Sequence, residues 1–307
     1  MSDKTKGFIF AIIALFSWGI HGPAGRWLSV NGVDPFFVFA TRLWIGTAVF
    51  FVYLVVRRAL DLTILKKHWK HITLVALVGI CLNSAFYHLS LVYLHGTLVM
   101  ILENLSPVFV FILSFLILKI KPTKVQIISL IISLTGLYVI MMGKGSFPEL
   151  GDTYGLGIVL GVLTGLTFGI YVFFSATLMT PYKSDPLKII QMLFSIFLIS
   201  SILMTPIIFL HTGEKPNTNL EWLWLLEMGL FQSGVAYLFW NYALAYLPVN
   251  TSSVLFALAV FFTTVNEVLF LHLKVNHSLV LGGVLIMLAS YLLSKEKGSA
   301  KAKRQET

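Results

Sequence analysis

Ten long apolar blocks run through the 307-residue sequence, and each is long enough to cross a lipid bilayer as a helix. A bilayer core of roughly 30 Å needs about 20 apolar residues per helix. The blocks lie at residues 7 to 28, 35 to 57, 72 to 93, 96 to 118, 123 to 142, 154 to 178, 187 to 210, 221 to 246, 249 to 271 and 276 to 294. Hydrophobic residues make up 57% of the chain and charged residues 11%. We therefore predict an all-α integral membrane protein with ten transmembrane helices, the first retained rather than cleaved as a signal peptide.

The positive charges fall on one side of this predicted membrane protein. If the N-terminus is cytoplasmic, the cytoplasmic segments hold seventeen lysines and arginines: Lys4, Lys6, Arg57, Arg58, Lys66, Lys67, Lys70, Lys119, Lys121, Lys124, Lys183, Lys188, Lys295, Lys297, Lys301, Lys303 and Arg304. The opposite side holds three: Lys144, Lys215 and Lys274. Positive residues favour the cytoplasmic side, so both termini are predicted to lie there. The net charge of +9 thus indicates membrane topology rather than nucleic-acid binding.

The two halves of the chain also resemble each other. Matches occur at offsets of 150 to 153 residues, and "DP" at Asp34 and Pro35 recurs at Asp185 and Pro186. Nine residues recur at the offset of 153, namely Phe86, Leu91, Tyr93, Leu94, Phe109, Leu116, Leu118, Lys121 and Tyr138. Each copy contains five predicted helices, and an odd number of spans turns the second copy upside down. Inverted repeats of this kind are typical of secondary transporters, whose substrate site lies near the midplane between the repeats.

Two long runs carry a family resemblance. They are "NSAFYHLSLVYLHGTLVMILENLSPVFVFILSFLIL" at 83 to 118 and "SGVAYLFWNYALAYLPVNTSSVLFALAVFFTTVNEVLFL" at 233 to 271. With "WG" in the first span and "ATRLWIG" in the second, they resemble EamA-type members of the drug/metabolite transporter (DMT) superfamily. The chain departs from that family after the fourth and ninth spans, where Ile120 and Leu273 replace a common glutamate.

The resemblance implies a domain plan and a function. We expect a first EamA-like repeat over 1–146, a second over 147–294 and a basic cytoplasmic tail over 295–307. The family implies a transporter in the cytoplasmic (cell inner) membrane that exports or exchanges amino acids or other small metabolites. The main alternative is a non-transporting membrane scaffold or receptor of the same fold. The oligomeric state stays open, with a monomer as the simplest expectation.

Ionisable residues inside the predicted spans are the first candidates for functional groups. A charge at mid-bilayer costs at least about 2.5 to 3.5 kcal/mol, so such groups should face a cavity or a partner. Arg26 and Glu227 lie near helix ends, where their side chains can reach the interface. Arg42, Glu103 and Glu267 lie deeper and are expected to form an ion pair or a proton site. Proton coupling and facilitated exchange both remain open.

The first span contains the cluster "SWGIHGPAGRW" at 17 to 27. Pro23 removes a backbone hydrogen bond, and freed carbonyls at that depth are tolerated only against protein or a water-filled cavity. Trp18 and His21 share a helix face and match Phe168 and Tyr171 in the second copy. We predict that Trp18, His21 and Tyr171 line a substrate cavity. The alternative is a kinked helix with a satisfied core histidine.

The third and eighth spans carry a second set of candidate substrate-binding residues. These are Asn83, Tyr87 and His88 in one span, and Tyr237, Trp240 and Asn241 in the other. Aromatic rings with hydrogen-bonding groups suit a zwitterionic or ring-bearing metabolite, although an interfacial aromatic belt is the alternative for the tyrosines. A cavity-lining role predicts that Trp240→Ala weakens binding without much loss of folded protein. By contrast, Gly157, Gly161, Gly165 and Gly169 form a small-residue ridge that predicts helix packing.

Catalysis, nucleotide binding and metal binding find little support in the sequence. Ser84 with His88 could suggest a serine hydrolase, but no orienting acid is evident. The run "MGKGS" lacks the glycine and the hydroxyl residue of a phosphate loop, so no ATP site is expected. His68 and His71 lack acidic or thiol companions. We expect neither an enzyme nor a cofactor or metal site, and the predicted partners are a small metabolite and the lipid bilayer.

Overall fold

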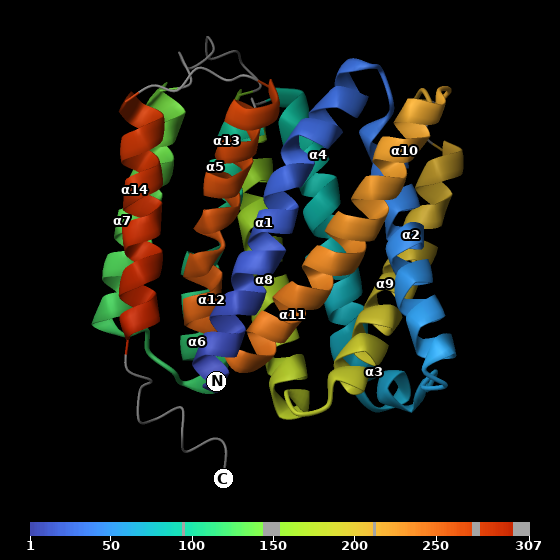
Figure 1. Ribbon diagram of the computed structural model, residues 1–307, viewed down its shortest axis with the longest axis horizontal. Coiled ribbons are helices and arrows are strands. Elements are labelled where there is room, and N and C mark those ends of the chain that lie inside the picture. The colour runs from blue at the N-terminus through green and yellow to red at the C-terminus, as the bar shows by residue number, and fades with distance from the viewer. Residues whose placement is uncertain (94–95, 144–153, 211–212, 272–276, 297–307) are drawn as a thin grey trace.

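The computed structural model describes residues 1–93, 96–143, 154–210, 213–271 and 277–296, excluding some side chains within helices such as those of residues 20–26 and Glu267. The helices of the described residues group into ten segments, as predicted, and Figure 1 shows them packed side by side as one bundle. In the first half they are α1 (Asp3–Val30), α2 (Pro35–Val56), α3 with η1 and α4 (Thr63–Leu74, Val75–Leu82 and Asn83–Tyr93), α5 with α6 (Gly96–Glu103 and Ser106–Leu118), and α7 (Lys124–Gly143).

The second half repeats this order. Its segments are α8 with η2 (Tyr154–Met179 and Thr180–Tyr182), α9 (Pro186–Leu210), α10 with η3 and α11 (Asn219–Glu227, Met228–Ala236 and Tyr237–Tyr246), α12 with α13 (Val249–Leu255 and Ala257–Leu271), and α14 (His277–Lys295). Within the described residues, six helical stretches are long and apolar enough to cross a membrane.

The helix contacts follow the symmetry of an inverted repeat. Helix α2 packs on its counterpart α9, and α7 packs on its counterpart α14 at one edge of the bundle (Figure 1). Helix α1 packs on α11 and α13, while its counterpart α8 packs on α4 and α6. Each repeat therefore buries its helices mainly against the other repeat, and the core lies between the two copies.

Both repeats are interrupted at matching positions. Segments η1 and η3 are π-helical and begin at Val75 and Met228, 153 residues apart. The fourth span breaks between α5 and α6 beside Pro107, and the ninth breaks at Phe256 between α12 and α13. Proline cannot complete the helical hydrogen bonds, and broken spans of this kind commonly line ion or substrate sites.

The predicted glycine ridge of α8 is a packing surface. A Cβ atom added at Gly165 would lie 2.6 Å from the Leu102 carbonyl oxygen, and one at Gly161 would displace the Leu102 side chain. One added at Gly169 would lie 3.0 Å from Phe109. These close approaches require glycine and bring α8 against the break between α5 and α6, where Glu103 lies.

Candidate functional site

Arg42 lies on the helix face of α2 that meets η3 of the other repeat. Its guanidinium carbon lies 4.9 Å above the centre of the Phe39 ring, and its Nη1 donates a hydrogen bond to Oε1 of Gln232. Its buried Nε has no hydrogen-bond partner. The ion pairs within the described residues are Lys183 with Asp3 and Lys188 with Asp185, so no described carboxylate forms an ion pair with Arg42.

Glu103 is the last residue of α5, directly before the helix break. Its carboxylate lies within reach of the Asn83 amide, whose Nδ2 also donates to the Thr164 carbonyl oxygen at 3.0 Å. Glu103 likewise takes no part in the ion pairs found among the described residues. The expected alternative of a direct Arg42–Glu103 ion pair is therefore not formed in this conformation.

Two tyrosines lie near both of these opposite charges. Tyr87 of α4 and Tyr237 of α11 are each close enough to interact electrostatically with both Arg42 and Glu103. All four side chains are deeply enclosed by protein, and each keeps a partly exposed surface. The four residues form the central charged cluster, to which each repeat contributes.

His88 of α4 lies next to this cluster and packs against α2. Its ring centre lies 5.3 Å from that of Phe36 and 6.3 Å from that of Phe39, and Arg42 and Asp34 are near enough to influence its charge. The buried Nδ1 atom has no hydrogen-bond partner. The unpartnered Nδ1 of His88 and Nε of Arg42 leave additional hydrogen-bonding capacity at this site.

Trp18 joins the first helix to the cluster through an aromatic group. Its ring centre lies 5.3 Å from that of Tyr237, 5.5 Å from that of Trp240 and 6.0 Å from that of Phe256. The Trp18 side chain retains partial exposure. Trp18 of the "SWGIHGPAGRW" cluster therefore lies beside Tyr237 of the central charged cluster.

Tyr171, Trp240 and Asn241 are core residues in this conformation, with exposed fractions of 1%, 0% and 0%. Asn241 Nδ2 donates to the Tyr171 hydroxyl at 2.8 Å and to the Tyr237 carbonyl oxygen at 2.8 Å. These residues pack beneath Tyr237 and have almost no exposed surface themselves. His21 and Glu267 lie outside the described side chains, so their predicted roles stay predictions.

Gln232 and Thr164 were not among the residues singled out from the sequence. The only signal for Gln232 is a polar residue in an apolar span, and Thr164 takes part through its backbone carbonyl. Among the described residues, no group of three or more histidine, cysteine, aspartate or glutamate side chains could hold a metal ion. The arrangement instead offers separate positive and negative groups, tyrosine hydroxyls and aromatic surfaces.

Comparison with known proteins identifies the family. The pattern of the EamA-like transporter family matches residues 5–142 and again residues 155–295. An uncharacterized transporter of Clostridium kluyveri is 22% identical over 291 residues, covering 94% of this chain and 92% of the relative. One of Archaeoglobus fulgidus is 25% identical over 275 residues, covering 88% and 91%.

The fold is also found in a solved crystal structure. It superimposes with a TM-score of 0.79 over 99% of both chains at 17% sequence identity, which shows a shared fold. Because the family pattern matches both five-helix repeats, the chain belongs to the EamA-like transporter family and is a multi-pass membrane transporter, not an enzyme.

Proposed function

We propose that this transporter carries small zwitterionic metabolites of the amino-acid class and works as an exporter or exchanger. The observation that carries the proposal is the central charged cluster, in which Arg42 and Glu103 lie near the same two tyrosines without forming an ion pair. A zwitterion with a carboxylate and an ammonium group complements this pair of charges.

The energetics of charges in a membrane support a ligand at Arg42. An arginine within a span is retained where it faces a partner or a water-filled space, because its desolvation is unfavourable. Arg42 has one hydrogen bond to Gln232, and its Nε is unused. Arginine binds carboxylates through two parallel hydrogen bonds. A substrate carboxylate would supply the negative partner that the described side chains do not.

Glu103 has the complementary role in the proposal. Its position at the α5–α6 break, with Asn83 alongside, suits it to accept the substrate ammonium group. A carboxylate in this place could also carry a proton when the substrate site is empty, which would couple transport to the proton gradient. Exchange without protons is the competing mode.

Alternating access fits the matched interruptions of the two repeats. The π-helical segments η1 and η3 and the two broken spans lie at equivalent positions in the repeats and at their interface. Rocking of one repeat against the other would expose the cluster to each side in turn. The seventeen-to-three distribution of lysine and arginine supports cytoplasmic termini in this scheme.

The test is substrate counterflow in proteoliposomes with matched ligands. An amino acid should exchange, whereas its methyl ester lacks the carboxylate and its deaminated analogue lacks the ammonium group, so both should exchange poorly. Arg42→Gln should erase the preference for the amino acid over the ester, and Glu103→Gln should erase the preference over the deaminated analogue. Lys188→Gln, which removes a charge paired with Asp185 at the surface, is the control and should change neither preference.

Several results would contradict the proposal. If Arg42→Gln and Glu103→Gln retain both preferences, the central charged cluster does not bind the charged groups of the substrate. Absence of exchange with every class of metabolite would favour the scaffold alternative. For the coupling mode, an imposed pH gradient should drive amino-acid accumulation in the unmodified protein and not in Glu103→Gln, and accumulation that ignores the gradient would exclude proton coupling.

A further inference from the structure

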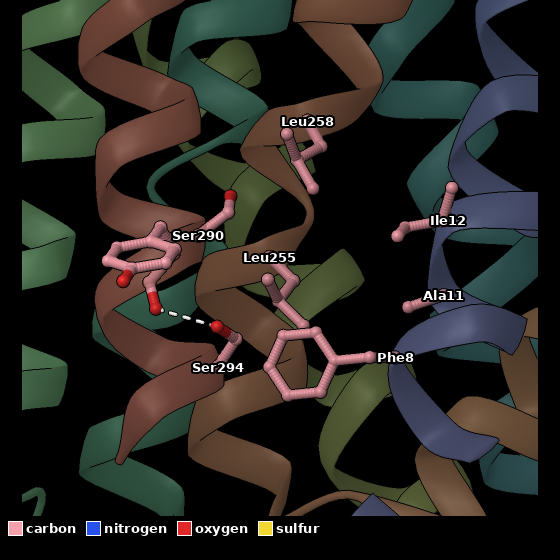
Figure 2. A pocket seen from close by; sticks show the side chains of 8 residues that line it. Phe8, Ala11, Ile12, Leu255, Leu258, Ser290 and Ser294 are labelled. Atoms are coloured by element: carbon pink, nitrogen blue, oxygen red, sulfur yellow. Dashed lines mark hydrogen bonds between the residues drawn. The ribbon is translucent and has the colours of Figure 1, made fainter. Parts of the chain in front are cut away.

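A narrow groove opens between α1 and α14, away from the central charged cluster. It has a volume of about 190 Å³ and is lined by Phe8, Ala11, Ile12, Leu255, Leu258, Ser290, Tyr291 and Ser294. Figure 2 shows Phe8, Ala11 and Ile12 on one side and Ser290 and Ser294 on the other, with Leu255 and Leu258 between them. The groove therefore crosses the seam between the first helix of one repeat and the last helix of the other.

The walls of the groove are apolar in practice. Ser290 Oγ donates to the Ile286 carbonyl oxygen at 3.0 Å, and Ser294 Oγ donates to the Tyr291 carbonyl oxygen at 2.8 Å. Both hydroxyl protons are thus used within α14, while Ala11 and Leu255 form a closed inner surface with exposed fractions of 1% each. The groove offers contact for hydrocarbon and little for a polar ligand.

Two lysines stand at the end of this groove. Lys4 Nζ lies 5.8 Å from the centre of the Phe8 ring, and Lys295 Nζ lies 5.6 Å from the centre of the Tyr291 ring. Both rings line the groove, so one ammonium group marks each wall. Lys4 also donates to the Glu296 carbonyl oxygen, which ties the start of α1 to the end of α14.

The acidic groups nearby have other partners. Asp3 pairs with Lys183 at 3.3 Å, and the Glu296 carboxylate accepts a hydrogen bond from Thr123 while also lying near Lys4. Lys295 is exposed and is absent from the ion pairs formed by the described residues. The mouth of the groove thus presents positive charge that the protein does not fully neutralise, a combination suited to an anionic headgroup.

We propose that the groove between α1 and α14 binds one acyl chain of an anionic phospholipid whose headgroup contacts Lys4 and Lys295. Phe8 follows Lys4 by four residues, or about 6 Å along a helix, so the groove begins where the first carbons of a chain leave the headgroup region. The groove is narrow and apolar and the two ammonium groups stand at one end of it, which suits an unbranched hydrocarbon chain joined to an anionic headgroup.

A lipid at this seam would contact both repeats at once. It would touch α1, which packs on the second repeat, and α14, which packs on α7 of the first. The proposal does not depend on the substrate or on the direction of transport.

Native mass spectrometry of the purified full-length protein tests the headgroup. Phosphatidylglycerol should bind at least tenfold more tightly than phosphatidylcholine with identical chains. Lys4→Gln combined with Lys295→Gln should abolish that preference. The control is Lys67→Gln combined with Lys70→Gln, which removes two lysines that also lie over aromatic rings, at 5.9 and 5.7 Å, but outside the groove lining. An equal loss in both double variants, or no loss in the first, would overturn the proposal.

The acyl chain is tested separately. Ser290→Phe should fill the groove and weaken both lipids. A phosphatidylglycerol with a photoreactive acyl chain, which needs no variant, should label residues 8–12 and 290–294 of the unmodified protein. Labelling elsewhere would reject the groove as the chain site. A change of oligomeric mass in Ser290→Phe with unaltered lipid binding would also reject the proposal, and would assign the groove to a contact between two copies.

Discussion

Truncation of Trp240 should destabilise the protein before it affects binding. The Trp240 side chain has an exposed fraction of 0% and packs between Trp18 and Phe256, with ring centres 5.5 and 6.1 Å away. The prediction from the sequence that Trp240→Ala spares the fold is therefore replaced by its opposite. A buried indole of this kind fills the core behind Tyr237, so its loss leaves a cavity between the repeats.

The size of the effect follows from the cavity. Each Å³ of residual cavity costs about 24 cal/mol, so a cavity of roughly 100 Å³ costs about 2 to 3 kcal/mol. The additional water-to-core transfer contribution seen in soluble proteins is reduced here, because an unpacked membrane helix is already in an apolar solvent. For a chain of this length each kcal/mol corresponds to about 2 °C, so the melting temperature should fall by about 4 to 6 °C.

The assay is thermal unfolding in a single detergent, with substrate binding measured on the surviving protein at low temperature. Trp240→Phe is the matched variant, because it keeps an aromatic ring and removes an indole nitrogen that has no hydrogen-bond partner. It should lose less than about 1 kcal/mol. Trp69→Ala, at a side chain with an exposed fraction of 56%, should have little effect. An unchanged melting temperature in Trp240→Ala together with lost binding would restore the cavity-lining role.

Three further predictions concern packing and pH. Gly165→Ala should lower stability by about 1 to 3 kcal/mol in thermal unfolding, since its Cβ would lie 2.6 Å from the Leu102 carbonyl oxygen, whereas Gly155→Ala, with nothing within 4 Å, should not. Thr47→Val and Ser201→Ala should show a coupling energy of about 0.5 to 1 kcal/mol in a double-mutant cycle, because their hydroxyls lie 2.9 Å apart between α2 and α9. The Thr63 hydroxyl and backbone N–H donate to Asp61 and hold the pKa of its carboxyl below the usual value. The stabilisation of the start of α3 by these two hydrogen bonds is therefore complete above about pH 4 and is lost as the pH falls through the lowered pKa. Hydrogen-exchange protection of the first turn of α3 should fall in that range in the unmodified protein and stay constant in Asp61→Asn.

The architecture could be predicted from the sequence because the bilayer imposes it. Span length and the offset of about 150 residues are one-dimensional signals, and both correspond to features of the helix bundle, whereas the membrane orientation inferred from the positive charges stays a prediction. The glycine spacing on α8 gave a packing surface for the same reason, since four-residue periodicity defines a helix face.

The arrangement of the site could be predicted only in part. Charged residues such as Arg42 and Glu103 stand out in an apolar span, but their lack of an ion pair depends on side-chain geometry. Trp240 and Tyr87 occupy matching positions in the two copies, and both are aromatic residues in apolar spans, so the sequence around them does not distinguish a buried from an exposed position. One is fully buried and the other partly accessible, because burial depends on which helix of the opposite repeat packs against each. Sequence periodicity contains no direct record of that contact.

The two copies share a backbone plan but contribute different side chains to the site. At the repeat offset of 153, Glu103 corresponds to Phe256 and His88 to Asn241. At these two positions, a titratable residue of the first copy is thus replaced by an apolar or neutral residue in the second. The second copy contributes the rings of Tyr171 and Phe197, which pack edge-on against Tyr237 with centres 5.7 and 5.0 Å away. Duplicating the charges would double the desolvation penalty in the membrane without adding a second ligand to offset it. Among the described side chains, the two opposite charges of the central charged cluster, Arg42 and Glu103, therefore both come from the first copy, and the proposed single substrate site needs no second set.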